Sequence, residues 1–132
     1  AIVAIVDPFS TGAHLAAEVC KQGYRCARVF SVWDSPVASL VQKGLKIDFC
    51  ATVQHNDRLP DQEQAVGETV EALRDLGFPV VAIIAGAETG VELSDQLSFA
   101  MKLRTNGIRK SLARRHKYHM GENVRNAGVR AV

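Results

Sequence analysis

The sequence predicts a doubly wound α/β fold, in which a parallel sheet of about four to five strands has helices on both faces. Two wholly apolar runs, AIVAIV at 1–6 and PVVAIIA at 79–85, are typical of strands that are covered on both sides. Segments with helical spacing of apolar residues follow the strands, and glycines end several of these segments. This alternation favours right-handed strand-helix-strand units and a Rossmann-like sheet.

The expected elements follow one another without a long linker. In order, they are a strand at 1–6, a helix at 14–22, a strand at 24–31, a helix at 36–43, a strand at 49–53, a helix at 61–76, a strand at 79–85 and a helix at 91–103. Ser35 and Pro36 suit the start of the second helix, since Ser caps helix amides and Pro fits the first helical position. Apolar residues mark the inner faces of two helices: Leu15, Ala16 and Val19 in the first, and Val66, Val70 and Leu73 in the third.

Composition favours one globular domain with a single core. The chain has 132 residues, of which 47% are hydrophobic and 23% charged. No apolar run reaches the roughly 18 residues that a membrane span needs. Cys20, Cys26 and Cys50 form no metal-binding spacing, so we expect small buried thiols and a reducing compartment, either the cytoplasm or an organelle interior.

Charge is distributed unevenly along the chain. The net charge is +2, but residues 102–132 hold nine Lys or Arg and one acid, Glu122. The asymmetry indicates an anionic partner for this end, which could be nucleotide phosphate, nucleic acid or an acidic surface of the same protein. A solvated basic helix is the alternative.

Polar side chains follow the expected strands, at the edge where ligands usually bind in such sheets. We expect these side chains to face one crevice: Asp7, Ser10, Thr11, Asp34, Gln54, His55, Asn56, Asp57 and Glu88. The first turn, DPFSTG, has one glycine where a dinucleotide fingerprint has three, which disfavours NAD.

Two of these loops hold candidate substrate-binding residues. Ser10, Thr11 and Gly12 could bind a carboxylate or phosphate of a small ligand, or they could simply cap the helix that follows. Glu88, between two glycines, could bind an amine or cap the next helix.

The histidines support no strong site. His55 and Asp57 share a loop, so His55 could act as a general base, although a polar surface loop is the preferred interpretation. His116 and His119 lack a carboxylate ligand partner nearby, so no metal site is predicted.

The closing stretch departs from the strand-helix rhythm. It begins with a turn at 105–107 (TNG), and Met120, Val124 and Ala127 then predict a helix that Gly128 ends. Lys117 lies at the start of that helix, where a cation opposes the helix dipole. An anionic ligand would explain its position; a flexible surface lysine is the alternative.

Three motifs carry a resemblance to a known family. They are AGAETGVELSDQLS at 85–98, LRTNG at 103–107 and SLARRHKYHMGENVRNAGVRAV at 111–132. With them, the chain resembles the carboxylate-amine ligases of the ATP-grasp superfamily. The resemblance implies a Rossmann-like domain at 1–103 and, at 104–132, a helical junction and first strand that lead into an ATP-grasp domain.

The resemblance also implies an activity for the longer protein. Such enzymes activate a carboxylate as an acyl phosphate with ATP and Mg²⁺ and transfer it to an amine, and a lysine at the position of Lys117 reaches the nucleotide phosphates. The family usually has Asn or Asp before that lysine, where this chain has His116. The glycine-rich loop, the second nucleotide lysine, the Mg²⁺ ligands and the catalytic arginine are expected beyond residue 132.

We therefore expect a piece of a longer ligase that is not catalytic alone. Its expected partners are the rest of its own ATP-grasp domain, a small carboxylate and a small amine. A homo-oligomer or larger assembly is possible, and neither nucleic acid nor a membrane is expected. The alternatives are a noncatalytic scaffold or docking subunit and a free-standing domain that binds a nucleotide or sugar nucleotide.

Overall fold

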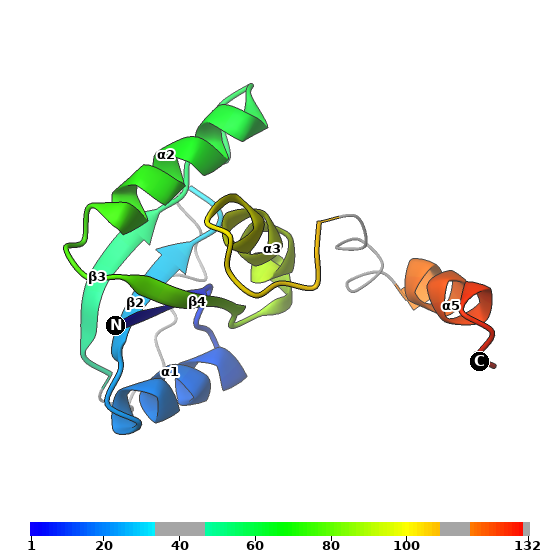
Figure 1. The fold of residues 1–132 in the computed structure, drawn as a ribbon, viewed down its shortest axis with the longest axis horizontal. Helices are drawn as coiled ribbons and strands as arrows, with labels where there is room; N and C mark the ends of the chain where they lie inside the picture. Colours follow the sequence, from blue (N-terminus) through cyan, green and yellow to red (C-terminus); the bar gives the residue numbers. More distant parts are fainter. Residues whose placement is uncertain (34–46, 109–116, 131–132) are drawn as a thin grey trace.

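The computed structural model describes residues 1–33, 47–108 and 117–130 (Figure 1). The predicted helix at 36–43 and the candidate residue Asp34 lie outside the described residues. So does His116, the neighbour of Lys117.

Four parallel strands form the described sheet. They are β1 (Ile2–Val6), β2 (Arg25–Phe30), β3 (Phe49–Gln54) and β4 (Val80–Ala85), in the spatial order β3-β2-β1-β4. The chain adds β2 and β3 on one side of β1 and then places β4 on the other side. Because the order reverses at β1, the carboxyl ends of β1 and β4 form the position where such folds usually bind ligands.

Helices cover both faces of the sheet. Helix α1 (Thr11–Lys21) lies on one face, and α2 (Gln62–Arg74) and α3 (Val91–Ala100) lie on the other (Figure 1). The predicted doubly wound fold is therefore confirmed.

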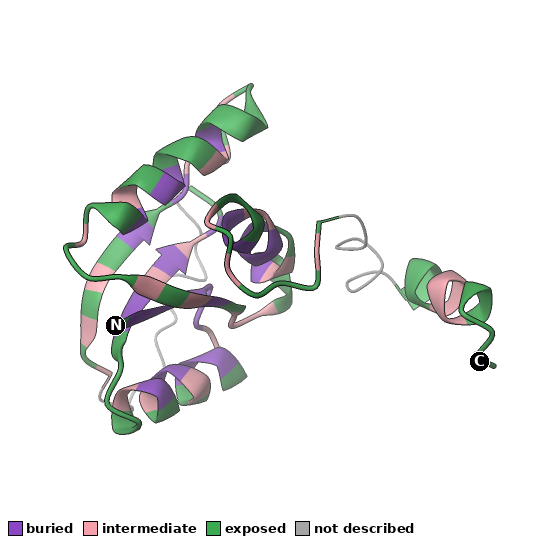
Figure 2. Ribbon diagram, in the orientation of Figure 1, coloured by how far each residue is buried: buried purple, intermediate pink, exposed green. Residues whose placement is uncertain are grey.

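Alternate residues of β1 build the two cores. Ile2, Ala4 and Val6 belong to a buried cluster that includes Leu73 of α2 and Leu97 of α3. The intervening Val3 and Ile5 pack in a second cluster with residues of α1. All five residues of β1 are buried, as the continuous apolar run predicted (Figure 2).

Helix bounds differ from the expected ones where the adjoining turns are tight. Helix α1 begins at Thr11 rather than His14, and the turn before it contains two residues with positive φ, Asp7 at 55° and Ser10 at 51°. A short 3₁₀ helix, η2 (Glu88–Gly90), precedes α3 and was not predicted. Helix α2 begins as expected, since the Asp61 carboxylate accepts a hydrogen bond from the Gln64 amide at 3.2 Å.

The last described helix is α5 (Lys117–Asn126), which contains the predicted Met120 and Val124 and lies apart from the sheet in Figure 1. The resemblance implied a first strand within 104–132, and the structure has no strand at its described residues 104–108 and 117–130. None of the helices in the described ranges is both long and apolar enough to cross a bilayer.

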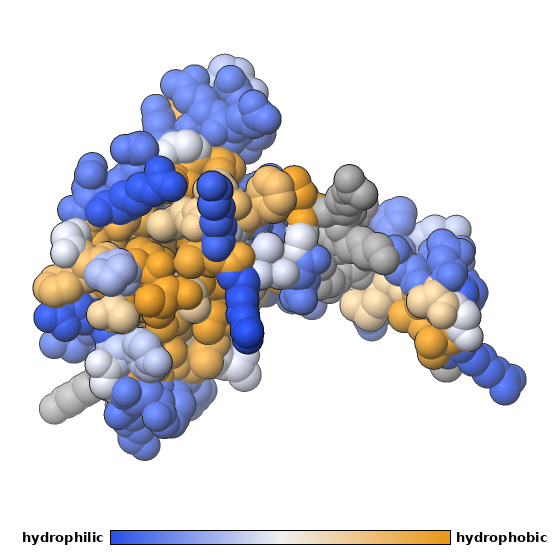
Figure 3. Space-filling view, in the orientation of Figure 1, coloured by the Kyte–Doolittle hydropathy of each residue, from blue (hydrophilic) through white to orange (hydrophobic). Residues whose placement is uncertain are grey.

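The burial of the three cysteines differs from the sequence expectation, and β4 has exposed apolar side chains. Cys26 is fully buried and Cys20 half-buried, but Cys50 is exposed, so the expectation of three buried thiols is wrong for Cys50. Side chains of β4, including Val81 and Ile84, are exposed, and Figure 3 shows an apolar surface over this strand.

Candidate functional site

Asp7, the first residue after β1, connects three segments at the carboxyl edge of the sheet. Its side chain is buried and accepts hydrogen bonds from the Ser31 amide at 2.9 Å and the Ser31 hydroxyl at 2.5 Å. It also accepts one from the Thr89 hydroxyl at 2.6 Å. The carboxylate therefore ties the ends of β1 and β2 to the loop after β4. Instead of facing an open crevice, as the sequence indicated, Asp7 is a structural acceptor.

Two glycines bring the loops after β1 and β4 into direct contact. A Cβ added at Gly12 would lie 2.3 Å from the Gly86 carbonyl oxygen. One added at Gly86 would lie 2.6 Å from the Asp7 carbonyl oxygen. Because no side chain fits between them, the turn at 7–12 packs on the loop at 86–90 through its backbone. Gly12, a candidate ligand contact, is buried in this junction.

Ser10, Thr11 and Glu88 lie on these two touching loops with exposed side chains. Ser10 stands at the cap position of α1, but its side chain makes no capping hydrogen bond; its φ of 51° and ψ of −119° differ from those of an ordinary cap. The capping alternative is thus wrong for the Ser10 side chain. Glu88 is the first residue of η2, and Ala87 holds the cap position there. The edge accordingly presents two hydroxyls and one carboxylate to solvent.

Gln54, the last residue of β3, and Asp57 in the loop that follows form hydrogen bonds to neighbouring loops. The Gln54 amide group donates to the carbonyl oxygens of Phe30, Val32 and His55 at 3.2, 3.1 and 2.8 Å. The Asp57 carboxylate accepts from the Trp33 amide at 2.8 Å. These bonds fix the ends of β2 and β3 to each other, so the predicted cluster of crevice residues is in large part structural.

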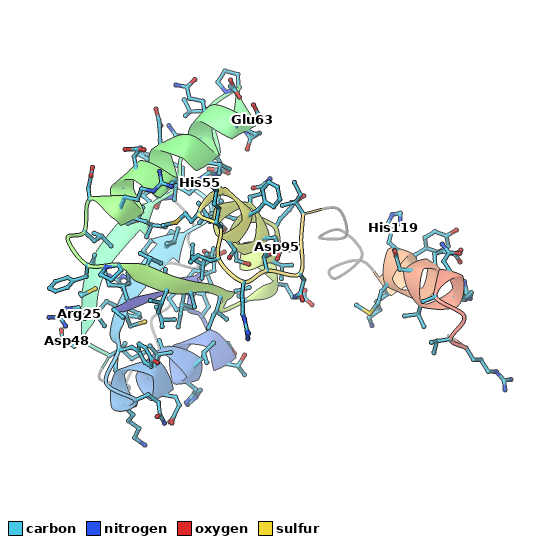
Figure 4. The ribbon with its side chains drawn as sticks, viewed as in Figure 1. Arg25, Asp48, His55, Glu63, Asp95 and His119 are labelled. Carbon is cyan, nitrogen blue, oxygen red and sulfur yellow. The ribbon has the colours of Figure 1, made fainter. Side chains whose placement is uncertain are left out.

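His55 is buried, so its interpretation as part of a polar surface loop is wrong (Figure 4). Its Nδ1 lies 2.7 Å from the Thr69 hydroxyl, which is 3.1 Å from the Ala65 carbonyl oxygen. Burial lowers the pKa of His55 below its ordinary value of 6.5, and the charge of Asp57 opposes this shift. The contacts link the end of β3 to α2. Sequence reasoning missed this role because Thr69 lies 14 residues away, on another element.

Lys117 is the first residue of α5 and has an exposed side chain. Its side chain makes no ion pair or hydrogen bond with any residue that the structure describes, whereas Arg125 on the same helix pairs with Glu122. Figure 4 shows His119, two residues after Lys117, on a helix well away from His55. Lys117 therefore lies on α5, an element other than the two loops that hold Ser10 and Glu88.

A hollow of about 700 Å³ lies beside α5, and the sequence did not predict it. Its walls come from β4, α3, the turn at 104–106 and α5, and include Ile83, Asp95, Asn106, Met120 and Val124. The Thr105 hydroxyl donates to the Asp95 carboxylate at 3.5 Å on its rim. Met120 and Val124, the apolar stripe of α5, thus line this hollow.

Among the described residues, one suits a phosphate group of ATP, but none form a set of ligands for Mg²⁺. The exposed ammonium of Lys117 suits a phosphate group. Within the described ranges, no three His, Cys, Asp or Glu side chains lie close enough together to hold a metal ion. The described part of the chain therefore fits a phosphate contact and offers no set of metal ligands.

Comparisons with known proteins relate the chain to two ligases. No family model matches it. Its sequence is 30% identical over 132 residues to dapdiamide A synthase of Enterobacter agglomerans, a match that covers 99% of this chain and 29% of that protein. Its fold matches the crystal structure of an L-amino acid ligase from Bacillus licheniformis with a TM-score of 0.67 and 14% identity, covering 98% of this chain and 31% of that one.

The chain thus spans about 30% of the length of each protein. The structural match shows the shared fold, while the sequence match runs along almost the whole chain. Both comparisons support the resemblance to the carboxylate-amine ligases of the ATP-grasp superfamily that was drawn from the three motifs, and the match to the L-amino acid ligase shows the shared α/β fold.

Proposed function

We propose that the chain is the N-terminal domain of a longer enzyme that uses ATP to join a carboxylate to an amine through an acyl phosphate. The observation that carries the proposal is the sequence match to dapdiamide A synthase, since it extends over 99% of the chain. The fold match to an L-amino acid ligase supports the same class of activity. An amino acid is the class of substrate that the name of the L-amino acid ligase favours.

We further propose that the chain divides near Leu103. Residues 1–103 form the Rossmann-like domain, and residues 104–132 form the junction to an ATP-grasp domain that holds most of the catalytic groups. The separation of α5 from the sheet supports this division (Figure 1). In this arrangement the N-terminal domain contributes one wall of the active-site cleft.

Different residues serve different parts of the reaction in this proposal. Lys117 contacts the nucleotide phosphates, where a cation offsets negative charge. Ser10, Thr11 and Gly12 form the turn that faces a substrate carboxylate, and the exposed carboxylate of Glu88 suits a substrate ammonium group. ATP with Mg²⁺ supplies the phosphoryl group that activates the carboxylate, and the Mg²⁺ ligands belong to the ATP-grasp domain.

Thermal unfolding of the full-length protein with and without ATP and Mg²⁺ tests the role of Lys117. A ligand that binds the folded state raises the melting temperature. We expect a clear rise for the wild type and for Lys21→Ala, which removes an exposed lysine of α1 as a control. Lys117→Ala should lose most of the rise while its melting temperature without ATP stays unchanged. An equal rise in Lys117→Ala would show that this lysine does not contact the nucleotide.

A further inference from the structure

The Asp7 carboxylate lies beneath both loops that hold the candidate substrate residues. Two hydroxyls, from Ser31 and Thr89, donate to the same oxygen, Oδ2, at 2.5 and 2.6 Å. Such short distances are typical of hydrogen bonds to an ionised carboxylate, which are stronger than neutral ones. Asp7 is 2% exposed, so its carboxylate relies on hydrogen bonds from the protein.

Thr89 connects this buried carboxylate to the candidate residue next to it, Glu88. The loop at 86–90 is held at its start by a hydrogen bond from the Gly86 amide to the Val6 carbonyl oxygen, at 2.7 Å. Near its end, the Thr89 hydroxyl is bound to Asp7. Glu88 lies between these two attachments with its side chain in solvent. The position of the Glu88 carboxylate therefore depends on the contact between Thr89 and Asp7.

The same carboxylate holds the loop against the turn that contains Ser10 and Thr11. Asp7 is the first residue of that turn, and its carbonyl oxygen would be 2.6 Å from a Cβ at Gly86. One residue thus touches the loop at 86–90 through both its backbone and its side chain. A change in the contact would move Glu88 relative to the Ser10 and Thr11 hydroxyls.

We propose that Asp7 is a positioning residue that acts through Thr89 to hold the Glu88 carboxylate where it can bind the ammonium group of an amino-acid substrate. The inference rests on the proposed ligase function, because it gives the loops at 7–12 and 86–90 the role of a substrate wall. Asp7 itself is buried and contacts no substrate. Its role is to fix the loop that carries Glu88 relative to the turn that carries the Ser10 and Thr11 hydroxyls.

The matched substitutions Thr89→Val and Thr89→Ser separate positioning from general stability. Valine removes the hydroxyl but keeps the shape of threonine, whereas serine keeps the donor. Thr52→Val is the control, because Thr52 is an exposed threonine on β3 whose hydroxyl accepts a hydrogen bond from Arg28 Nε at 2.7 Å. All three changes are made in the full-length protein.

Steady-state kinetics give the first readout. Phosphate release is measured with pairs of the standard L-amino acids, and the most active pair is used for all variants. We expect Thr89→Val to raise KM for the amine-supplying amino acid about tenfold, the effect of losing one charge-assisted hydrogen bond. Its kcat and its KM for ATP should stay near those of the wild type. Thr89→Ser and Thr52→Val should retain the wild-type KM.

Hydrogen exchange gives a second readout that needs no substrate. Amides of residues 86–90 should exchange faster in Thr89→Val, and at the wild-type rate in Thr89→Ser. An unchanged KM or unchanged exchange in Thr89→Val would overturn the proposal, as would a failure of serine to restore either. If no amino-acid pair gives phosphate release, the proposed ligase function is wrong and the substrate role of Asp7 is wrong with it. The hydrogen-exchange rates of residues 86–90 would then still show whether the contact of Asp7 with Thr89 holds this loop in place.

Discussion

His55 makes the stability of the chain depend on pH. Its imidazole is buried against Thr69, and burial lowers its pKa in the folded state below 6.5. The unfolded chain then binds a proton that the folded chain does not bind at the same pH. Stability from this residue is thus fully present above pH 6.5 and is lost as the pH falls through the lowered pKa of the folded state.

Urea unfolding at pH 7.5 and pH 5.5 checks this pH dependence. The wild type should lose up to about 1.4 kcal/mol of unfolding free energy between the two values. His55→Asn, which cannot take up the proton, should lose much less. His14→Asn, at an exposed position of α1, should behave as the wild type. Equal pH dependence in His55→Asn and the wild type would contradict the assignment to His55.

For single residues, the sequence predicted positions in the fold but not hydrogen-bond partners. The position of Asp7, after a buried strand, predicted a polar residue at the ligand-binding edge, and Asp7 is at that edge. Its partners were not predictable, because Ser31 lies 24 residues away and Thr89 lies 82. Periodicity identifies the element that holds a residue, but hydrogen bonds between loops depend on the register of strands in the sheet. His55 was wrongly predicted to lie in a surface loop because its contact with Thr69 of α2 also depends on the tertiary structure.

Between elements, Gly12 and Gly86 form a close backbone contact at the carboxyl edge. A methyl group at Gly12 would lie 2.3 Å from a backbone oxygen, which cannot move aside as a side chain can. Gly67, in the middle of α2, has nothing within 4 Å of an added Cβ. The two glycines therefore offer matched substitutions with opposite expected effects.

Gly12→Ala should lower the free energy of unfolding by at least about 2 kcal/mol, since overpacking a close contact forces the backbone apart. Gly67→Ala should raise it by roughly 0.5 to 1 kcal/mol, because alanine favours the helix. Urea unfolding of both variants beside the wild type measures the two changes. Little or no loss in Gly12→Ala would mean that the loops at 7–12 and 86–90 do not pack as closely as described.

At the level of elements, the sequence predicted the type and order of the described strands and main helices. Continuous apolar runs identified β1 and β4, and apolar spacing identified α2. The 3₁₀ helix at Glu88–Gly90 was not predictable, because its three residues are too few to show a period. The helix-capping role expected of the Ser10 side chain failed because the backbone there has positive φ.

In the whole molecule, positive charge is concentrated toward the end of the chain, where residues 102–132 hold nine Lys or Arg and one acid. The candidate substrate loops lie on the Rossmann-like domain, while Lys117 lies on α5, which is separate in Figure 1. This separation agrees with a site that is completed by further residues, as expected for a chain that spans about 30% of its relatives. Under the proposed function, one basic residue of 102–132, Lys117, would contact the nucleotide, and others would contact the rest of the longer protein.

The most direct test of the ligase proposal is amino-acid-dependent phosphate release by the full-length protein. With ATP, Mg²⁺ and a suitable pair of L-amino acids, we expect phosphate and a dipeptide in equal amounts, the peptide being identified by mass spectrometry. Release should require both a free carboxylate and a free amine, and it should fall sharply in Lys117→Ala but not in Lys21→Ala. A folded protein that releases no phosphate with any pair would contradict the proposal and would favour a noncatalytic scaffold.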